Sequence, residues 1–335
     1  MILAGDIGGT KTNLAFFEVE GDKLKTLDEA TFSSQEFRSL EELMQEFLGS
    51  HSYKVDLASL SIAGPVINGT CKATNIPWNV DSATVSTELG FNSTWLINDL
   101  EANAHGITHL GEDEYVVLHA GKPGMHGNAC VVSAGTGLGE AGMFWNGDGY
   151  IPFACEGGHT DFGPRNEEQI DLLRYIRRDH RHVSYERVLS GMGLLNIYEF
   201  LRDTNRMEEP EWLSQELAME DDQAATISRF AIEGKAQICV KALDIFVEIY
   251  GAEVGNAALK FMAFGGVFIG GGIAPKIIDK LKQPAFMEAF LDKGRMSTVM
   301  EYMPVKVIMN NRTALYGAAR YALLKSGQLK AKAVV

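Results

Sequence analysis

Two segments far apart in the chain share one pattern: an apolar strand-like run, a tight turn of glycine and threonine, and a second strand-like run. The first is Ile2–Asp6 followed by Gly8-Gly9-Thr10, and the second is Ala129–Ser133 followed by Gly135-Thr136-Gly137. Glycine lets a ligand approach the backbone, and the N–H groups of such a turn can cradle a phosphate. One copy is explained equally well by a plain hairpin. Two copies favour two similar halves that hold the β- and γ-phosphates of one nucleotide.

Other phosphate-binding patterns do not match. The chain has no GxxxxGK[ST] motif, because Gly234-Lys235 is followed by Ala236. The spacing Gly135-x-Gly137-x-Gly139 runs into a strand-like stretch instead of opening a helix, which argues against a dinucleotide fingerprint. The run Gly270–Gly272 does precede a predicted helix and offers a flat surface for an adenosine, but a triple glycine is weak evidence by itself.

Length and charge narrow the class of protein. At 335 residues and 46% hydrophobic composition, the chain is long enough for two domains with a cleft between them. The net charge of −14 disfavours nucleic acid and anionic lipid as partners. No leader and no apolar window of membrane-spanning length is visible, so we expect a cytoplasmic protein that does not bind a membrane. The four cysteines are scattered without a CxxC pair, so neither a zinc knuckle nor a disulfide framework is indicated.

Hydrophobic periodicity predicts a mixed α/β organisation. Residues 2–33 read as an antiparallel meander, and Ser93–Ile97 reads as a strand followed by a helix over Leu100–Leu110. Apolar positions at helical spacing predict one long helix over Ala224–Ile249, which ends near Gly251. A closing helix is expected over Thr313–Leu324.

Two acidic residues stand at predicted strand ends. Asp6 is well placed to hold a magnesium ion through water, because Mg²⁺ prefers few carboxylates and several waters. Asp99 follows Asn98 at the end of a strand, where α/β folds place ligands, and can serve as a base. The alternative for Asp99 is the N-cap of the following helix, a role that Asp fills readily.

A polar cluster follows in the second half of the chain. Glu156, His159 and Asp161 lie on a glycine-containing turn, and carboxylate and imidazole groups suit sugar hydroxyls. A metal site is disfavoured because no cysteine or second histidine follows at ligand spacing before His180 and His182, and a structural turn is the remaining alternative. Glu186 is by default a solvated charge.

The order and separation of these motifs resemble the bacterial glucokinase family. Three stretches are specific: LINDLEANAHG at 96–106, ACEGGHTDF at 154–162 and ERVLSGMGL at 186–194. The resemblance implies a two-lobed α/β fold of the actin/hexokinase type, with mixed ribonuclease-H-like sheets and a central cleft for sugar and ATP. We expect a small lobe over 1–110, rejoined by about 302–322, and a large lobe over 111–301. A related group of sugar kinases carries a cysteine-rich zinc loop after its Gly-His element; Gly158-His159 lacks that loop, which favours the zinc-free branch.

The resemblance also implies an activity, the transfer of the γ-phosphoryl group of ATP to the 6-hydroxyl of D-glucose. Asp99 resembles the catalytic base. The residues that resemble sugar ligands are Asn75, Asn98, Asp99, Glu156, His159 and Glu186. Those that resemble nucleotide contacts are Asp6, Gly8, Gly9, Thr10, Lys11, Thr12, Gly135, Thr136, Gly137, Gly271 and Gly272, with Asp6 as the water-mediated Mg²⁺ partner.

Alternatives stay open at this level. One is a kinase of another hexose, because epimers differ by one hydroxyl. Another is a catalytically silent sugar sensor, which has no need for a base at Asp99. An actin-like assembly or chaperone ATPase has no reason for the polar cluster at 156–161. The resemblance and the apolar long helix favour a homodimer.

Overall fold

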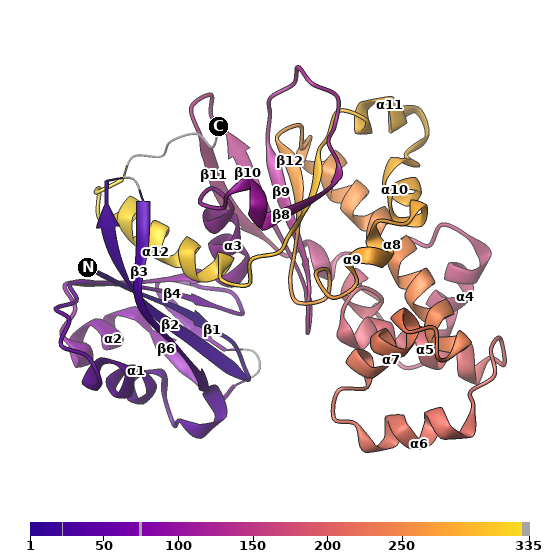
Figure 1. Ribbon diagram of the computed structural model, residues 1–335, viewed down its shortest axis with the longest axis horizontal. Helices are drawn as coiled ribbons and strands as arrows, with labels where there is room; N and C mark the ends of the chain where they lie inside the picture. The colour runs from indigo at the N-terminus through magenta and orange to yellow at the C-terminus, as the bar shows by residue number, and fades with distance from the viewer. Residues whose placement is uncertain (22, 74–75, 330–335) are drawn as a thin grey trace. The chain divides into compact units, whose positions relative to one another are not determined.

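The computed structural model describes residues 1–21, 23–73 and 76–329 (Figure 1). The chain divides into two compact units. Unit 1 comprises Met1–Glu114, Met143–Ala154 and the chain from Asn310 onward, and unit 2 comprises Tyr115–Gly142 and Cys155–Met309. Both units contain strands and helices, so the expected mixed α/β class is confirmed.

Unit 1 is built on a five-stranded sheet of order β3-β2-β1-β4-β7. The first three strands form an antiparallel meander, as predicted from the alternation of apolar runs and turns. β4 and β7 then extend the sheet in parallel with β1. The strands are β1 (Ile2–Ile7), β2 (Lys11–Glu20), β3 (Lys23–Ser33), β4 (Leu57–Ile62) and β7 (Ser93–Asn98).

Alternate residues of these strands face opposite layers of helices, because side chains in a strand alternate between the two faces. Leu3 and Leu14 pack in one cluster with α1 (Leu40–Gly49), whereas Ile2 and Ala4 pack in another with α12 (Thr313–Lys325). α2 (Ser82–Leu89) contacts β7, and α3 (Asp99–Ile107) packs against α12. The sheet is thus covered on both faces, which fixes the ends of β1 and β7.

The second sheet repeats this strand order. Its order is β11-β10-β9-β12-β13-β8, and β12 runs parallel to both β9 and β13. In each sheet, three strands that follow one another in the chain are extended by two parallel strands. This arrangement is the internal repeat that the two Gly/Thr turns indicated. The strands are β8 (Tyr115–His119), β9 (Ala129–Ala134), β10 (Leu138–Trp145), β11 (Tyr150–Cys155), β12 (Gly266–Gly270) and β13 (Val305–Ile308).

The predicted single helix over Ala224–Ile249 is wrong, because the structure has two helices there. α7 (Gln223–Ile232) ends before Gly234, and α8 (Gln237–Phe261) follows. The φ of Gly234 is +65°, in the left-handed region that glycine adopts at low cost and that ends a helix.

 

The prediction that the long helix ends near Gly251 is also wrong. Gly251 lies inside α8, where a Cβ would come within 2.1 Å of the Phe286 carbonyl oxygen, so glycine is needed for the close approach of α10 (Pro284–Leu291). A contact distant in sequence, and not a helix end, explains this glycine.

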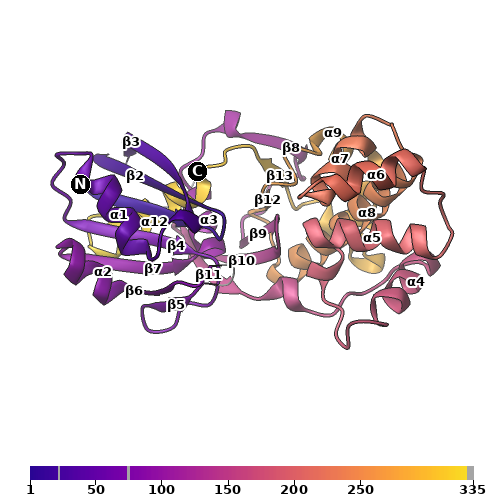
Figure 2. The same ribbon diagram turned by 90° about the horizontal axis from the view of Figure 1, so that it is seen from below.

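α8 forms the centre of unit 2. Its buried side chains include Phe246 and Tyr250, and it packs against α5 (Gly191–Asp203), α7 and α10, which Figures 1 and 2 show beside it. The remaining elements of the described chain are short or peripheral. They are β5 (Thr70–Lys72), β6 (Asn79–Asp81), α4 (Glu167–Ile176), α6 (Glu211–Met219), α9 (Ile278–Leu281), α11 (Ser297–Met300), and the 3₁₀ turns η1 (Ser34–Glu36), η2 (Glu112–Glu114), η3 (Gly157–His159), η4 (Tyr185–Arg187) and η5 (Gly294–Met296).

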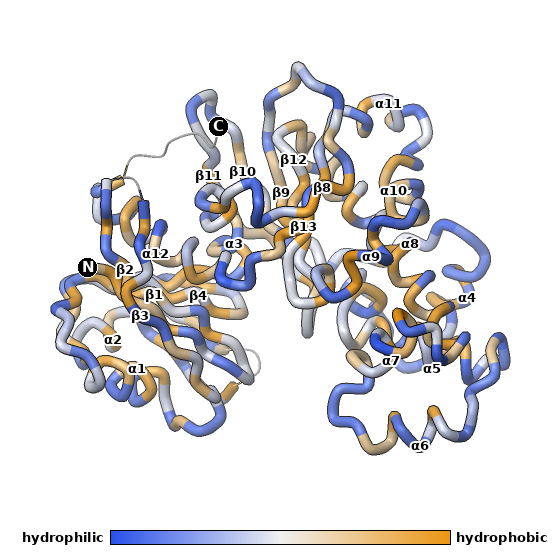
Figure 3. Tube along the Cα trace, in the orientation of Figure 1, coloured by the Kyte–Doolittle hydropathy of each residue, from blue (hydrophilic) through white to orange (hydrophobic). Residues whose placement is uncertain are grey.

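Hydrophobic residues gather on the central strands and on α8, and hydrophilic residues gather on the outer loops (Figure 3). Within the described residues, no helix combines the length and the apolar character that a membrane crossing requires.

Candidate active site

The first Gly/Thr turn joins β1 to β2. The Gly8 N–H donates to the Lys11 carbonyl oxygen at 3.0 Å, which closes the turn. Ser34 supports it from behind, since its hydroxyl donates to the Gly8 carbonyl oxygen at 2.8 Å and lies 2.9 Å from the Thr12 hydroxyl. Thr12 is fully buried, whereas the side chains of Thr10 and Lys11 are exposed. The turn therefore offers Gly8, Gly9, Thr10 and Lys11 to a ligand, and Thr12 braces it.

Asp6 lies at the end of β1, one residue before that strand's last position. Its neighbours in the sheet are Asn13 on β2 and Ser61 on β4, and the Ser61 hydroxyl donates to Asp6 Oδ1 at 2.7 Å. Burial raises the pKa of the Asp6 carboxyl, and the hydrogen bonds from Ser61 and Asn13 oppose that effect. Asp6 also lines a cavity of about 220 Å³ together with Thr31 and Arg312.

This surrounding fits a magnesium ion that is held mainly by water. The described residues contain no group of three or more His, Cys, Asp or Glu side chains placed to hold a metal. One carboxylate beside this cavity, which has room for several waters, with an amide and a hydroxyl next to it, matches the preference of Mg²⁺ for few protein ligands.

Asn98 and Asp99 stand where β7 ends and α3 begins. Asn98 is the N-cap: its Oδ1 accepts hydrogen bonds from the N–H groups of Leu100 at 2.9 Å and Glu101 at 3.3 Å. Its Nδ2 donates to the Gly64 carbonyl oxygen at 3.2 Å. The alternative that made Asp99 the N-cap is wrong, because the cap lies one residue earlier.

Asp99 is the first residue of α3 and is half-buried. Its Oδ1 accepts from the Leu100 N–H at 3.0 Å, and its carbonyl oxygen accepts from Asn103 Nδ2 at 3.0 Å. Burial raises the pKa of the Cys71 thiol, and the negative charge of Asp99 raises it further, so these two side chains interact electrostatically. The positive end of the α3 dipole stabilises a negative charge at Asp99.

The second Gly/Thr turn joins β9 to β10. The Gly135 N–H donates to the Gly137 carbonyl oxygen at 2.9 Å, and the Gly191 N–H at the start of α5 donates to the Gly135 carbonyl oxygen at 2.8 Å. Glu186 approaches closely, because its Oε2 accepts from the Leu138 N–H at 3.0 Å. A Cβ at position 137 would lie 2.5 Å from that oxygen, so this contact requires glycine.

Glu156 and His159 stand on the turn that follows β11. Their side chains are 67% and 58% exposed, and Glu156 Oε2 lies 3.8 Å from His159 Nε2, which is longer than a hydrogen bond. The segment after them is held firmly, since the Phe162 N–H donates to the Val183 carbonyl oxygen and the Tyr185 N–H donates to the Thr160 carbonyl oxygen. The same connections bring the 156–159 turn next to the segment that carries Glu186.

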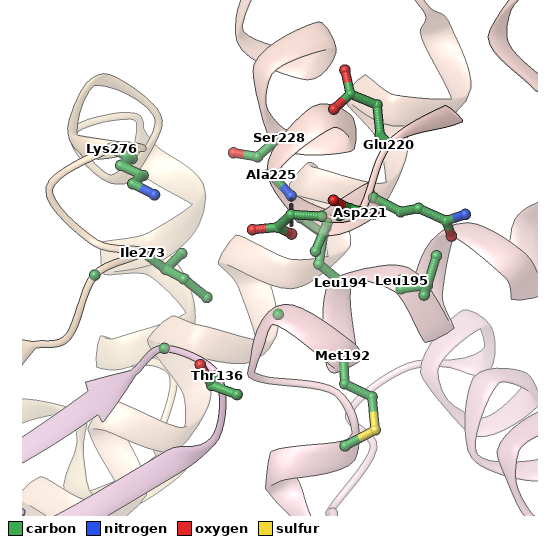
Figure 4. A pocket seen from close by; sticks show the side chains of 16 residues that line it. Thr136, Met192, Leu194, Leu195, Glu220, Asp221, Ala225, Ser228, Ile273 and Lys276 are labelled. Atoms are coloured by element: carbon green, nitrogen blue, oxygen red, sulfur yellow. Dashed lines mark hydrogen bonds between the residues drawn. The ribbon is translucent and has the colours of Figure 1, made fainter. Parts of the chain in front are cut away.

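A cavity of about 580 Å³ in unit 2 lies next to the second turn (Figure 4). Thr136 and Gly272 line it, whereas Gly271 and Gly137 do not. Its apolar lining includes Met192, Leu194, Leu195 and Ile273, and its polar lining includes Lys276, Ser228, Glu220, Asp221 and Asp222. This volume lies in the range of small-molecule sites, which bury an apolar ligand part and orient it with few polar groups.

Several of these cavity residues were not found from the sequence. Residues 220–228 carry no glycine-rich or otherwise distinctive pattern, and Asp222 caps α7 by accepting from the Ala225 N–H at 3.0 Å. Lys276 follows the triple glycine Gly270–Gly272, and that pattern is the sequence signal that could have identified it as a cavity residue. Among the predicted residues, Asn75 lies outside the described residues.

The predicted residues thus fall into two groups. Asp6, the first turn, Asn98 and Asp99 belong to unit 1, and the second turn, Glu156, His159 and Glu186 belong to unit 2 together with Gly271 and Gly272. Each group combines a glycine turn with carboxylates.

Comparisons with known proteins agree with one family. The glucokinase family model matches residues 3–325. Curated glucokinases from Nostoc punctiforme and Synechocystis are 39% and 40% identical, each over 95% of this chain and over 98% and 96% of their own lengths. A glucokinase from Yersinia pestis is 35% identical over 97% of both chains.

Solved structures lead to the same fold. The crystal structure of a glucokinase from an Antarctic psychrotroph matches with a TM-score of 0.83 and 30% identity, over 96% of this chain and 98% of that one. A glucokinase of the ROK family from Streptomyces griseus, solved in complex with glucose and AMPPNP, matches with a TM-score of 0.64 and 19% identity over 96% and 98%. The second likeness concerns the fold alone.

Proposed function

Because this chain belongs to the glucokinase family, whose activity is the ATP-dependent phosphorylation of D-glucose, we propose that Asp99 is the general base of that reaction. The observation that carries this proposal is the position of Asp99 at the end of β7, as the first residue of α3 and directly after the N-cap Asn98. The end of β7 and the start of α3 fix the position of a base there. The family membership does not favour the sugar sensor or a kinase of another hexose.

The proposed step is a single displacement. Asp99 accepts the proton of the glucose 6-hydroxyl while that oxygen forms a bond to the γ-phosphorus of ATP, and the bond between the γ-phosphorus and the bridging oxygen of ADP breaks. The products are glucose 6-phosphate and ADP. Because phosphoryl transfer depends on positioning and charge stabilisation, the other residues act by holding the two substrates.

The sugar ligands in this proposal are Asn98, Glu156, His159 and Glu186, with Asn75 added from the family resemblance. Asn98 Nδ2 has two hydrogens, of which one goes to the Gly64 carbonyl oxygen, so the other is available to a sugar hydroxyl. Glu186 uses Oε2 on the Leu138 N–H and offers Oε1 to the sugar. The exposed side chains of Glu156 and His159 are accessible to a ligand.

The nucleotide ligands are the two glycine turns and the cavity of unit 2. We assign the adenosine to the apolar lining of that cavity beside Gly272, with Gly271 as part of the same floor. The phosphates lie toward Thr136 and Lys276, since the acidic rim at 220–222 repels them and suits the ribose hydroxyls instead. The N–H groups of Gly8 and Gly135 close the two turns, so the phosphates meet the N–H groups of Gly9, Thr10 and Gly137, and Thr12 supports the first turn.

Asp6 is the residue that would hold Mg²⁺, through water. When bound, the ion neutralises charge on the phosphates. Ser61 and Asn13 orient the Asp6 carboxylate for this role by hydrogen bonding.

A homodimer, which rests on the family resemblance, and the cytoplasmic location expected from the sequence complete the proposal. The apolar long helix no longer supports a dimer, because α8 buries its apolar residues inside unit 2. Light scattering tests the dimer, since a dimer has twice the mass of 36.7 kDa.

The activity itself is tested by ADP release with Mg-ATP and a panel of glucose, mannose, fructose and N-acetylated hexoses, each with a blank without sugar. We expect release that depends on glucose and exceeds that of every other sugar. Greater turnover with another hexose contradicts the substrate, and calorimetric binding of glucose without turnover contradicts the enzyme.

A further inference from the structure

A buried carboxyl lies directly beneath the turn that carries Glu156 and His159. Glu140 on β10 is 1% exposed, and a Cβ added at Gly157 would lie 1.8 Å from Glu140 Oε2. Glycine at position 157 therefore lets the turn rest on this carboxyl. Glu140 Oε1 has no hydrogen-bond partner among the described residues. A buried carboxyl in contact with a ligand-binding turn is costly unless it is protonated or has a function.

The neighbour of Glu140 is a second buried carboxyl, Glu253 on α8, whose negative charge adds to the effect of burial in raising the pKa of Glu140. Glu253 is fully buried, and both of its carboxylate oxygens have partners. Its Oε1 lies 3.2 Å from Lys260 Nζ, and its Oε2 accepts a hydrogen bond from Asn256 Nδ2 at 2.8 Å. Two neighbouring buried carboxylates repel each other, and Lys260 is paired with Glu253. A proton on Glu140 therefore leaves one negative charge, on Glu253, for this lysine to balance.

The same network reaches the segment that carries Glu186. Asn256 Nδ2 also donates to the Tyr185 hydroxyl at 2.9 Å, and that hydroxyl is hydrogen-bonded to Glu253 and to the Gly163 N–H. Lys293 Nζ donates to Asn256 Oδ1 at 2.6 Å. The pair therefore touches the turn at 157 on one side and the residue before Glu186 on the other.

Titration of the pair has a defined direction. Burial raises the pKa of Glu140 to about 8, the charge of Glu253 raises it further in the same sense, and Lys260 opposes both. The other titratable groups that face the pair are Cys130 on β9, Cys155 on β11, Tyr185 and Lys293. Burial raises the pKa of both thiols and of Tyr185, so these three groups stay neutral while Glu140 loses its proton. Burial lowers the pKa of Lys293 to about 8, so Lys293 loses its charge over the same range, and the E140Q variant separates the two groups.

We propose that Glu140 and Glu253 are positioning residues for the sugar site: while Glu140 keeps its proton, the pair holds the 156–159 turn and Tyr185 in register, and loss of that proton weakens glucose binding. This inference rests on the proposed function, which assigns Glu156, His159 and Glu186 to the sugar. A second negative charge between buried groups repels the first and separates β10 from α8 beneath the turn.

The test is the pH dependence of the glucose KM between pH 7 and pH 9.5. Glu140→Gln keeps the shape and the hydrogen-bond donor of the protonated carboxyl but cannot ionise. We expect the wild-type glucose KM to rise about tenfold or more over this range while the ATP KM stays level, and the E140Q glucose KM to stay flat. The exposed Glu216→Gln, on α6, is the matched control and keeps the wild-type rise.

A second variant tests the contact itself. Glu140→Leu removes the carboxyl that lies against Gly157, and we expect a glucose KM about tenfold higher at pH 7, with the ATP KM near that of the wild type. The role of the pair is overturned by an E140Q profile that rises like the wild type, or by a wild-type KM that does not depend on pH. If E140L does not fold, the E140Q profile still decides. A wild type that neither binds nor phosphorylates glucose at pH 7 overturns the proposed function instead.

Discussion

Glu186 Oε2 accepts a hydrogen bond from the Leu138 N–H, 3.0 Å away, and so ties a proposed sugar ligand to the glycine turn proposed for the phosphates. The contact is possible because position 137 has no side chain. In the proposed site one carboxylate thus serves both substrates: Oε2 holds the turn and Oε1 is offered to glucose.

Two variants of Glu186 separate these roles. In Glu186→Gln the amide oxygen still accepts from the Leu138 N–H, but a donor replaces the oxygen that faces the sugar, so we expect the glucose KM to rise about tenfold and the ATP KM to stay level. Glu186→Ala loses both contacts, and both KM values should rise. Steady-state kinetics with each substrate varied in turn measure this. Equal effects of E186Q and E186A on the ATP KM contradict the bridging role.

Lys276 gives a test of the nucleotide cavity. In the proposal its ammonium group lies toward the phosphates, and a hydrogen bond to a charged group typically changes affinity about tenfold or more. Lys276→Met should therefore raise the ATP KM by about that factor and leave the glucose KM unchanged. Lys282→Met, another exposed lysine nearby in the chain, is the control. An unchanged ATP KM in K276M removes Lys276 from the phosphate site.

The buried ring of His105 makes the stability of unit 1 depend on pH in the acid range. It is buried near the end of α3 against Tyr321, and burial, followed by the charges of Arg320 and Lys325, lowers its pKa from 6.5 to about 3. The unfolded chain takes up a proton below pH 6.5 while the folded protein does not, so the stability is full above pH 6.5 and falls as the pH drops toward 3.

The expected loss from this one residue between pH 7 and pH 5 is about 2 kcal/mol in the free energy of unfolding. Urea unfolding of the wild type and of His105→Gln at both pH values measures it. The variant lacks the ionisable ring and should lose less stability over this interval, whatever its stability at pH 7. Equal losses in both proteins show that His105 does not contribute.

The sequence alone was informative where the signal is local. The two glycine turns, the meander at 2–33 and the closing helix follow from short runs of residues, and the structure has all of them. Thr12 differs from its neighbours in the turn: only the structure reveals Ser34 behind it, because that contact joins residues far apart in sequence.

Errors arose where tertiary contacts decide. Gly251 looked like a helix end, but it stands inside α8 because α10 needs room there. The cap of α3 is Asn98 and not Asp99, a difference of one residue that hydrogen bonds settle and composition cannot. The cavity residues at 220–228 and the Glu140–Glu253 pair carry no motif, since they acquire meaning only from what packs against them.

The central claim is that Asp99 removes the proton from the glucose 6-hydroxyl. The most direct measurement is kcat of Asp99→Asn together with glucose binding by calorimetry. Asn keeps the size of the side chain at the start of α3 but is not a base, so we predict that kcat falls at least about 10²-fold while glucose still binds. A kcat close to that of the wild type would show that Asp99 is not the general base.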